Sequence, residues 1–488
     1  MTLNQAILTC LSRGVVCLVV AMTVNLLVNR SAAADSRSDI FQPDVFGTGA
    51  ALRKRTPGLT DPLGRDCALP ATALSLSDAV DLALCRNPTT RSAWAAARQQ
   101  AAALGSAESA WLPSLSATGA ETRAYGEHVD VAGNLTSSPQ NTRDAALNLS
   151  WTLYDFGARG GRITSARRLL DAAAATTGSV VQQTVLNVVQ DYYGVVAGDA
   201  ALLAARTTEA TWARSLEVAR SLREGGVATL ADVLQAETAY DQSVLARVQS
   251  ERAAISAHGT LAVVIGLPAD QPLKLDAEPV PAEVPALTAR MTDLMAEAMR
   301  QRPDLASARA SRDSAEADIT VARAAGRPSI SIQAGHNFVG TLGLPNQNYS
   351  QVGVYVTVPI FSGFNVGYGV RQAQAVLEAR EASAEQVRLN VSLDVWNAYY
   401  ALDSANHQLA ATATLLKTAE NNQQVALGRY QSGVGTIIDL LTAQTAAANA
   451  LQLRINSELG WQVARAQLAL ALGRLSGAEP LATGSPLP

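Results

Sequence analysis

Hydrophobic positions follow a helical period over two long segments of the chain. In the first segment, apolar residues recur in alternating steps of three and four with one position skipped, the pattern of a helix that packs along one seam. They are Val181, Val185, Val188, Tyr192, Val195 and Leu202. No proline interrupts Arg159 to Glu224, so we predict one helix of roughly 65 residues, on the order of 100 Å long. A core helix is the simpler alternative for one segment, but proline-free spans of this kind occur in both halves.

A period of two appears in two shorter segments and predicts strands with one apolar face. Leu147, Leu149, Trp151 and Leu153 alternate with mostly polar residues, and the same alternation runs from Val352 to Ile360. Weaker partners follow Pro113 and Pro328, so we predict two β-hairpins, at 114–155 and 329–361, and four strands in all. A soluble β-sandwich is the alternative for any one of these strands.

The second half of the sequence repeats the first. The segment that ends at Pro88 matches the one that ends at Pro303, which is an offset of 215 residues. Further along, Gly226 aligns with Gly433 and Asp232 with Asp439, at an offset of 207. The difference lies between Pro113 and Trp151, where we expect a loop that tolerates insertion. The sequence therefore predicts an internal duplication.

The repeats and their flanking segments divide the chain into six parts. Arg13, the apolar run "GVVCLVVAMTVNLLV" and the A-x-A pattern at Ala32 and Ala34 indicate a secretory signal, with a signal anchor as the alternative. A proline-rich stretch separates the repeats. We predict a signal peptide at 1–34, an N-terminal extension at 35–74, a first repeat at 75–267, a linker at 268–286, a second repeat at 287–475 and a tail at 476–488.

The phrases "EGGVATLAD" and "QSGVGTIID" predict helical hairpins that turn near 225–229 and 432–436. Gly226 and Gly433 are suited to end the outgoing helix, and Thr229 and Thr436 to cap the returning one. Asp232 and Asp439 then lie in the first turn, where the helix dipole favours a carboxylate. Helix capping explains these aspartates as well as a role in a pore does.

Composition narrows the function. The formal net charge is -4 and 16% of residues are charged, so nothing indicates a nucleic-acid partner. There is no nucleotide-binding motif, metal-spaced cluster or nucleophile elbow, and the four histidines fall in different predicted elements. We therefore predict neither an enzyme nor a site for a cofactor or a metal. Cys67 and Cys85 either pair or remain thiols.

Four strands cannot close a barrel, and an open sheet edge in lipid leaves backbone groups unpaired. Other chains must complete such a sheet. Alternating faces are typical of a membrane barrel, and Phe156, Phe361 and Phe364 stand near the strand ends, where an aromatic girdle is expected.

Several motifs occur in the same order in both halves of the sequence. They are "CRNP" with "QRP", "LPSLS" with "RPSIS", and "LYDFG" with "PIFSG", and "YQSGVGTIIDLLTAQT" follows in the second half. Together they resemble the TolC family of bacterial outer-membrane efflux and secretion ducts. The resemblance covers about Ser75 to Leu475. It implies an α+β membrane protein: a homotrimer whose strands form one outer-membrane β-barrel, with four strands per chain, continued by a long periplasmic α-helical barrel.

The resemblance also implies that the second helical hairpin lines the periplasmic entrance. Asp439 matches an aspartate of a pore ring, Tyr430 a tyrosine that links helices in the closed state, and Asp232 an aspartate that accepts a link. Gly435 stands where the family has a linking arginine, and Thr442 where it has a second ring aspartate. The turn residues complete the predicted entrance: Gly226, Thr229, Gly433 and Thr436.

The function implied is that of a passive duct of a type I protein secretion system or a tripartite efflux system. Its partners would be a periplasmic adaptor, an inner-membrane ABC or RND-type transporter, and the lipid bilayer. The alternative is a periplasmic coiled-coil adaptor without its own pore. Many pump-dedicated relatives are lipoproteins, but neither Cys10 nor Cys17 of this chain stands in a lipoprotein setting. This favours protein secretion, with a multi-use channel as the nearest alternative.

Overall fold

The computed structural model describes residues 44–57, 59, 67–70, 73–129, 133–137, 140–276, 290–341 and 345–475. The predicted signal peptide, much of the predicted linker and the predicted tail lie outside these residues. The described residues form two compact units. The sheet unit holds those up to 55, 97–172 and 310–381, and the helix unit holds 56–96, 173–309 and those from 382 on.

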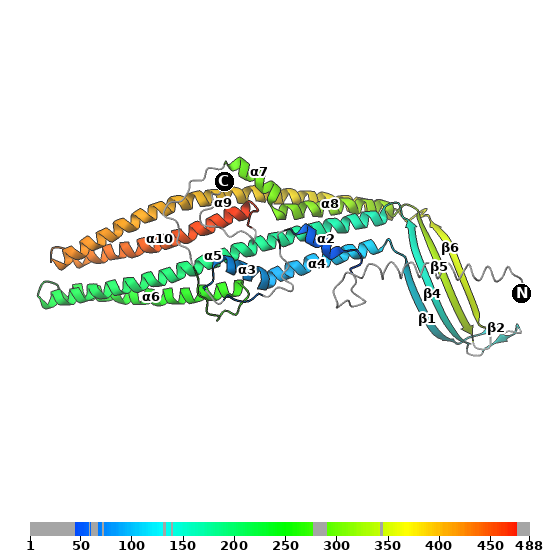
Figure 1. Ribbon diagram of the computed structural model, residues 1–488, viewed down its shortest axis with the longest axis horizontal. Coiled ribbons are helices and arrows are strands. Elements are labelled where there is room, and N and C mark those ends of the chain that lie inside the picture. Colours follow the sequence, from blue (N-terminus) through cyan, green and yellow to red (C-terminus); the bar gives the residue numbers. More distant parts are fainter. Residues whose placement is uncertain are drawn as a thin grey trace. The chain divides into compact units, whose positions relative to one another are not determined.

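Each of four helices in the first repeat has an equivalent helix of equal length in the second repeat (Figure 1). They are α3 Leu76–Arg86 and α7 Met291–Gln301, α4 Pro88–Ser109 and α8 Pro303–Ala324, α5 Ala158–Glu224 and α9 Asn365–Gln431, and α6 Leu230–Val264 and α10 Ile437–Ala471. The α5 and α9 helices have 67 residues each. The first two pairs start 215 residues apart (76 and 291, 88 and 303), and the last two start 207 apart (158 and 365, 230 and 437). The duplication predicted from the sequence is confirmed in these helices.

Four strands form one antiparallel sheet in the order β1-β4-β5-β6 (Figure 1). Their bounds are β1 Ser114–Ala124, β4 Gln140–Tyr154, β5 Ser329–Thr341 and β6 Gln347–Thr357. The central pairing joins the two repeats, with Leu147 opposite His336 and Trp151 opposite Ile332. One strand of each repeat, β1 or β6, is therefore an edge of the sheet.

The strands depart from the prediction in two places. The second hairpin was expected to end at 361, but β6 ends at Thr357. Pro359 has no N–H to donate and restricts the residue before it, which accounts for the early end. Between β1 and β4 lie two further strands of two residues each, which pair with one another and which the sequence did not predict. They are β2 His128–Val129 and β3 Leu135–Thr136.

The N-terminal extension contains a helix that its composition did not predict, α2 Thr48–Arg55. Both carboxylate oxygens of Asp44 accept backbone hydrogen bonds at its start, from Thr48 N at 2.8 Å and Gly49 N at 2.9 Å. At its end, the Arg55 guanidinium contacts the Asp171 carboxylate of α5 at 2.5 Å. In the sheet unit, α2 is thus attached to the first repeat.

A large apolar core in the helix unit surrounds Tyr192 of α5, which is 1% exposed. Its hydroxyl donates to Asp276 O at 2.6 Å and lies 3.2 Å from Leu74 O. Leu74 N in turn donates to Lys274 O at 2.7 Å. These bonds hold the segment before α3 beside the start of the inter-repeat linker.

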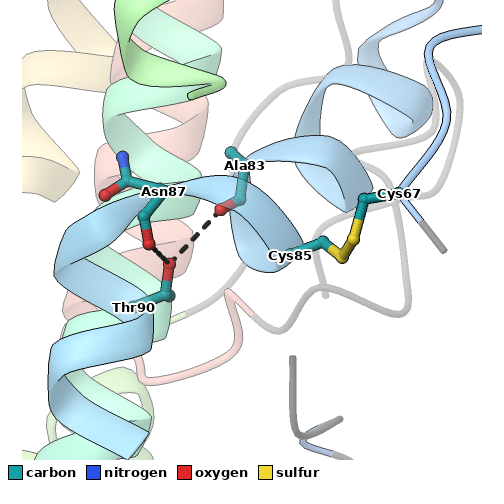
Figure 2. Close-up of a disulfide and its surroundings, with 5 residues drawn as sticks. All are labelled: Cys67, Ala83, Cys85, Asn87 and Thr90. Carbon is teal, nitrogen blue, oxygen red and sulfur yellow. Dashed lines mark hydrogen bonds between the residues drawn. A yellow bond between two sulfur atoms is a disulfide. The ribbon is translucent and has the colours of Figure 1, made fainter. Parts of the chain in front are cut away.

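A disulfide joins Cys67 to Cys85, the residue before the last one of α3 (Figure 2). Their Cα atoms are 6.2 Å apart, within the range of ordinary disulfides. One turn further on, Thr90 Oγ1 donates to Asn87 O at 2.9 Å and lies 3.3 Å from Ala83 O, which ties the end of α3 to α4. The sequence left the state of these cysteines open, and the structure shows them paired.

Candidate functional site

The two helical hairpins turn through the same backbone conformation. Gly226 and Gly433 both have φ of +73°, a left-handed conformation that is costly for residues with a Cβ. Their N–H groups donate to the carbonyl three residues earlier at 3.0 Å, and those of Val227 and Val434 to the carbonyl five residues earlier at 2.8 and 3.0 Å. This is the Schellman arrangement that ends helices at glycine.

The same capping box opens both returning helices. Thr229 Oγ1 accepts from Asp232 N at 3.2 Å, and Asp232 Oδ2 accepts from Thr229 N at 2.8 Å. For Thr436 and Asp439 the two distances are 3.2 and 3.3 Å. The predicted caps are confirmed, and both aspartates satisfy backbone groups that would otherwise lack partners.

Asp439 is exposed and carries its charge at neutral pH. Hydrogen bonds from the hydroxyl and the backbone N–H of Thr436 lower the pKa of its carboxyl, and the nearby Arg429 guanidinium lowers it further. Thr442 lies three residues later, also exposed, and so shares this face of α10.

Buried side chains from all four long helices meet beside the turns. This tip cluster consists of Leu216, Ala219, Val233, Ala236, Tyr430, Ile437 and Leu440. The turns themselves also approach, because a Cβ placed on Gly433 would lie 3.6 Å from Val227 Cγ1. The two turning points that the sequence singled out therefore lie side by side.

Tyr430 is 4% exposed, and its hydroxyl has no hydrogen-bond partner among the described residues. Burial raises the pKa of this phenol, and the negative charge of Asp232 raises it further. The resemblance implied linking roles for both residues. Within this chain, however, Tyr430 packs into the tip cluster, and the Asp232 carboxylate binds the backbone of Thr229.

Gly435, which stands where the family has an arginine, leaves little room for a side chain. A Cβ there would lie 3.1 Å from Arg429 Cβ and 3.2 Å from Tyr430 N. Arg429 lies beside this turn, and its positive charge lowers the pKa of Asp439.

A buried polar contact between the hairpins was not predicted from the sequence. Gln444 of α10 donates through Nε2 to Ser215 Oγ of α5 at 2.6 Å, and both side chains are buried. Gln444 occupies the core face that Ile437, Leu440 and Ala447 also line. The sequence signal for this contact was a polar residue, Gln444, at a position where helical spacing predicts an apolar one.

Other features of the described residues add no chemistry. A half-open cleft of about 490 Å³ in the helix unit is lined in part by Arg302, Asp304 and Asp394. The Arg302 guanidinium binds both carboxylates, at 2.6 and 3.0 Å. Within the described ranges, no group of histidine, cysteine, aspartate and glutamate side chains is arranged to hold a metal ion. Nor does any helix there have the length and apolar character that crossing a membrane requires.

One family model, described as outer membrane efflux protein, matches residues 79–267 and 294–474. The two matched stretches correspond to the two repeats and together make up most of the chain.

Individual relatives agree with this match. The chain is 28% identical to protein CyaE of Bordetella pertussis over 431 residues, which are 84% of this chain and 89% of that protein. It is 27% identical over 382 residues to the toluene efflux pump outer membrane protein TtgC of Pseudomonas putida, covering 74% and 75%. The solved structure of the outer membrane protein VceC of Vibrio cholerae superposes with a TM-score of 0.70 at 17% identity, over 82% of this chain and 96% of that one, and shares the fold.

Proposed function

This chain belongs to the outer membrane efflux protein family, and on that premise we propose that it is the exit duct of a type I protein secretion system. Membership makes it an outer-membrane channel that extends into the periplasm, and not an enzyme. The observation that carries the assignment as a duct is the combination in one chain of an open-edged sheet with paired long helical hairpins.

The proposed duct is a homotrimer. The sheet has two edges, β1 and β6, and unpaired backbone groups at such edges are costly in lipid. Pairing β6 of one copy with β1 of the next around a threefold axis satisfies both edges and closes the sheet. Trp151, Val354 and Val356 leave apolar surface exposed on the strands, as a lipid-facing wall requires.

The proposed periplasmic entrance lies at the hairpin tips, with Asp439 and Thr442 toward the axis. Three ionised Asp439 side chains around a narrow opening would favour cations. The tip cluster around Tyr430 would hold the closed state, in place of the arginine link for which Gly435 leaves little room.

We further propose that the tips receive a periplasmic adaptor and an inner-membrane transporter of the ABC class. Neither Cys10 nor Cys17 stands in a lipoprotein setting, and this supports protein secretion. The name of TtgC assigns that relative to a toluene efflux pump. Tripartite efflux with an RND-type transporter is the second candidate, and the TtgC match favours it.

The test places the full-length gene in two strains that lack their own channel of this family. One strain carries an ABC transporter, its adaptor and a protein substrate; the other carries a solvent efflux pump without its outer-membrane component. Protein in the medium of the first strain, without restored toluene tolerance in the second, is the expected result. Restored tolerance alone would favour efflux, and a monomeric purified protein that restores neither would favour the adaptor alternative.

A further inference from the structure

A buried hydrogen bond joins the two helical hairpins near their tips. Gln444 Nε2 donates to Ser215 Oγ at 2.6 Å, and the two residues are 3% and 1% exposed. Ser215 Oγ donates its own proton to Thr211 O at 3.1 Å, so its lone pair is available to accept from the amide. The bond connects residues 229 positions apart, one in each repeat.

The other half of the Gln444 amide is unsatisfied. Oε1 is buried and has no hydrogen-bond partner among the described residues. Its neighbours on α10, Ala443 and Ala447, are buried too, and the tip cluster begins one turn away at Leu440. A buried acceptor without a partner destabilises the closed contact, and this penalty disappears when the hairpins separate and water binds the acceptor. The contact therefore holds the hairpins together through Nε2 and favours their separation through Oε1.

The equivalent positions of the other pairing carry different chemistry. At the repeat offset of 207, Gln444 aligns with Glu237 and Ser215 with Asn422. Glu237 forms an ion pair with Arg220 at 3.2 Å, with the two side chains 44% and 55% exposed. Asn422 is exposed. The buried bond is therefore particular to this hairpin interface and is not a property of the repeat.

We propose that the Gln444–Ser215 bond sets how readily the α9–α10 hairpin separates from the α5–α6 hairpin, and with it the threshold at which the entrance opens. This inference rests on the proposed entrance. Because only one end of the Gln444 amide has a partner, changes at Ser215 and at Gln444 should affect the separation of the hairpins in opposite directions. Removing the Ser215 hydroxyl leaves both ends of the amide without partners and loosens the contact. Replacing the amide by an apolar side chain of similar length removes the unsatisfied acceptor and tightens it.

The experiment measures the distance between the tips in the full-length protein. Spin labels at Val227→Cys and Val434→Cys sit on turn residues that are 63% and 74% exposed. Labelled chains are diluted in unlabelled ones so that distances within one chain dominate, and urea is used to separate the tips. At a fixed urea concentration, Ser215→Ala is expected to raise the ratio of separated to joined tips about tenfold, and Gln444→Met to lower it about tenfold.

The matched control is Gln452→Ala on the same helix. It removes an exposed amide bond from Gln452 Nε2 to Asn456 Oδ1 at 3.1 Å and is expected to leave the ratio unchanged. If Ser215→Ala does not assemble, the Gln444→Met variant decides the question alone, because it preserves the packed volume.

Unchanged ratios in both variants, or shifts in the same direction, would overturn the inference. Conductance recorded on the same samples keeps the two proposals apart. If the wild type conducts but neither variant changes the separation of the tips, only the role of this bond is contradicted. If the two variants shift the tips in opposite directions but the protein never conducts, the role of the bond is supported and the proposed entrance is contradicted.

Discussion

The guanidinium of Arg159 lies over the indole ring of Trp111, 4.2 Å from its centroid. The Arg159 side chain is 5% exposed and also donates to Thr152 O at 2.6 Å, to Leu153 O at 2.9 Å and to the Asp155 carboxylate at 3.0 Å. One side chain thus joins the end of α4, the end of β4 and the start of α5.

The second repeat builds the same junction with different residues. At the repeat offsets, Trp111 aligns with Gly326 and Arg159 with Val366. A Cβ on Gly326 would lie 2.9 Å from Val366 Cγ1, so these two also touch. A large aromatic with a cation in one repeat corresponds to a glycine with a small apolar residue in the other.

Replacing Arg159 by alanine should destabilise the first junction. The change leaves a half-satisfied Asp155 and deprives three carbonyls of this donor, those of Ala110, Thr152 and Leu153. We therefore expect a loss of about 3 kcal/mol in the free energy of unfolding. Urea unfolding in detergent measures it. Arg143→Ala, which breaks a pair with Glu121 that is 75% and 66% exposed, should cost about 0–1 kcal/mol. Equal losses in the two variants would contradict the account of Arg159.

Reduction of the Cys67–Cys85 disulfide should lower stability. The bond spans 18 residues, a loop for which cross-linking stabilises by about 3 kcal/mol. Cys67→Ser should therefore unfold at a lower urea concentration than wild type, and a reductant should shift wild type to the same midpoint. Titration of thiols in the unreduced, denatured wild type should detect neither cysteine. A full thiol signal from both would refute the pairing.

Low pH should loosen the first turn of α10. The folded-state pKa of Asp439 is lower than its unfolded value. Its stabilising contribution is therefore fully present above the unfolded pKa and is lost as the pH falls through the folded one. Amide exchange at residues 437–440, corrected for intrinsic rates, should accelerate over that acidic window. Asp439→Asn should remove the pH dependence, and an Asn variant that retains it would assign the effect elsewhere.

Alanine at Gly433 should weaken the second turn, because φ of +73° is unfavourable for a residue with a Cβ. We expect a loss of about 1 kcal/mol in the free energy of unfolding. Gly428→Ala is the control: it lies inside α9, and a Cβ there would meet nothing within 4 Å. That change should stabilise by up to about 1 kcal/mol. Identical signs for the two substitutions would contradict the turn conformation.

Local periodicity predicted the parts of the fold that it controls. Val185, Val188 and Tyr192 recur at helical spacing and are all buried in α5. Glycine followed by a threonine cap predicted both hairpin turns. In contrast, α2 buries only Thr48 and Leu52, which is too short a pattern to recognise in a polar segment.

The site was predicted less completely, because its contacts join distant parts of the chain. Asp439 and Thr436 are neighbours on one helix, so their bond follows from local rules. Gln444 and Ser215 meet only because the two hairpins pack together. The position of a polar residue on an apolar helix face does not predict which residue it will contact. Nor did resemblance to the family indicate that Tyr430 would be buried in this chain without a hydrogen bond.

Ion conductance across a planar bilayer tests the central claim most directly. The purified full-length protein, its mass determined in detergent, is compared with Asp439→Asn and with Asp232→Asn, which alters the equivalent cap of the first hairpin. We predict a trimer with cation-selective conductance, whose selectivity falls in Asp439→Asn and is retained in Asp232→Asn. A monomer without conductance would contradict the channel, and a conducting trimer whose selectivity ignores Asp439 would contradict the proposed entrance.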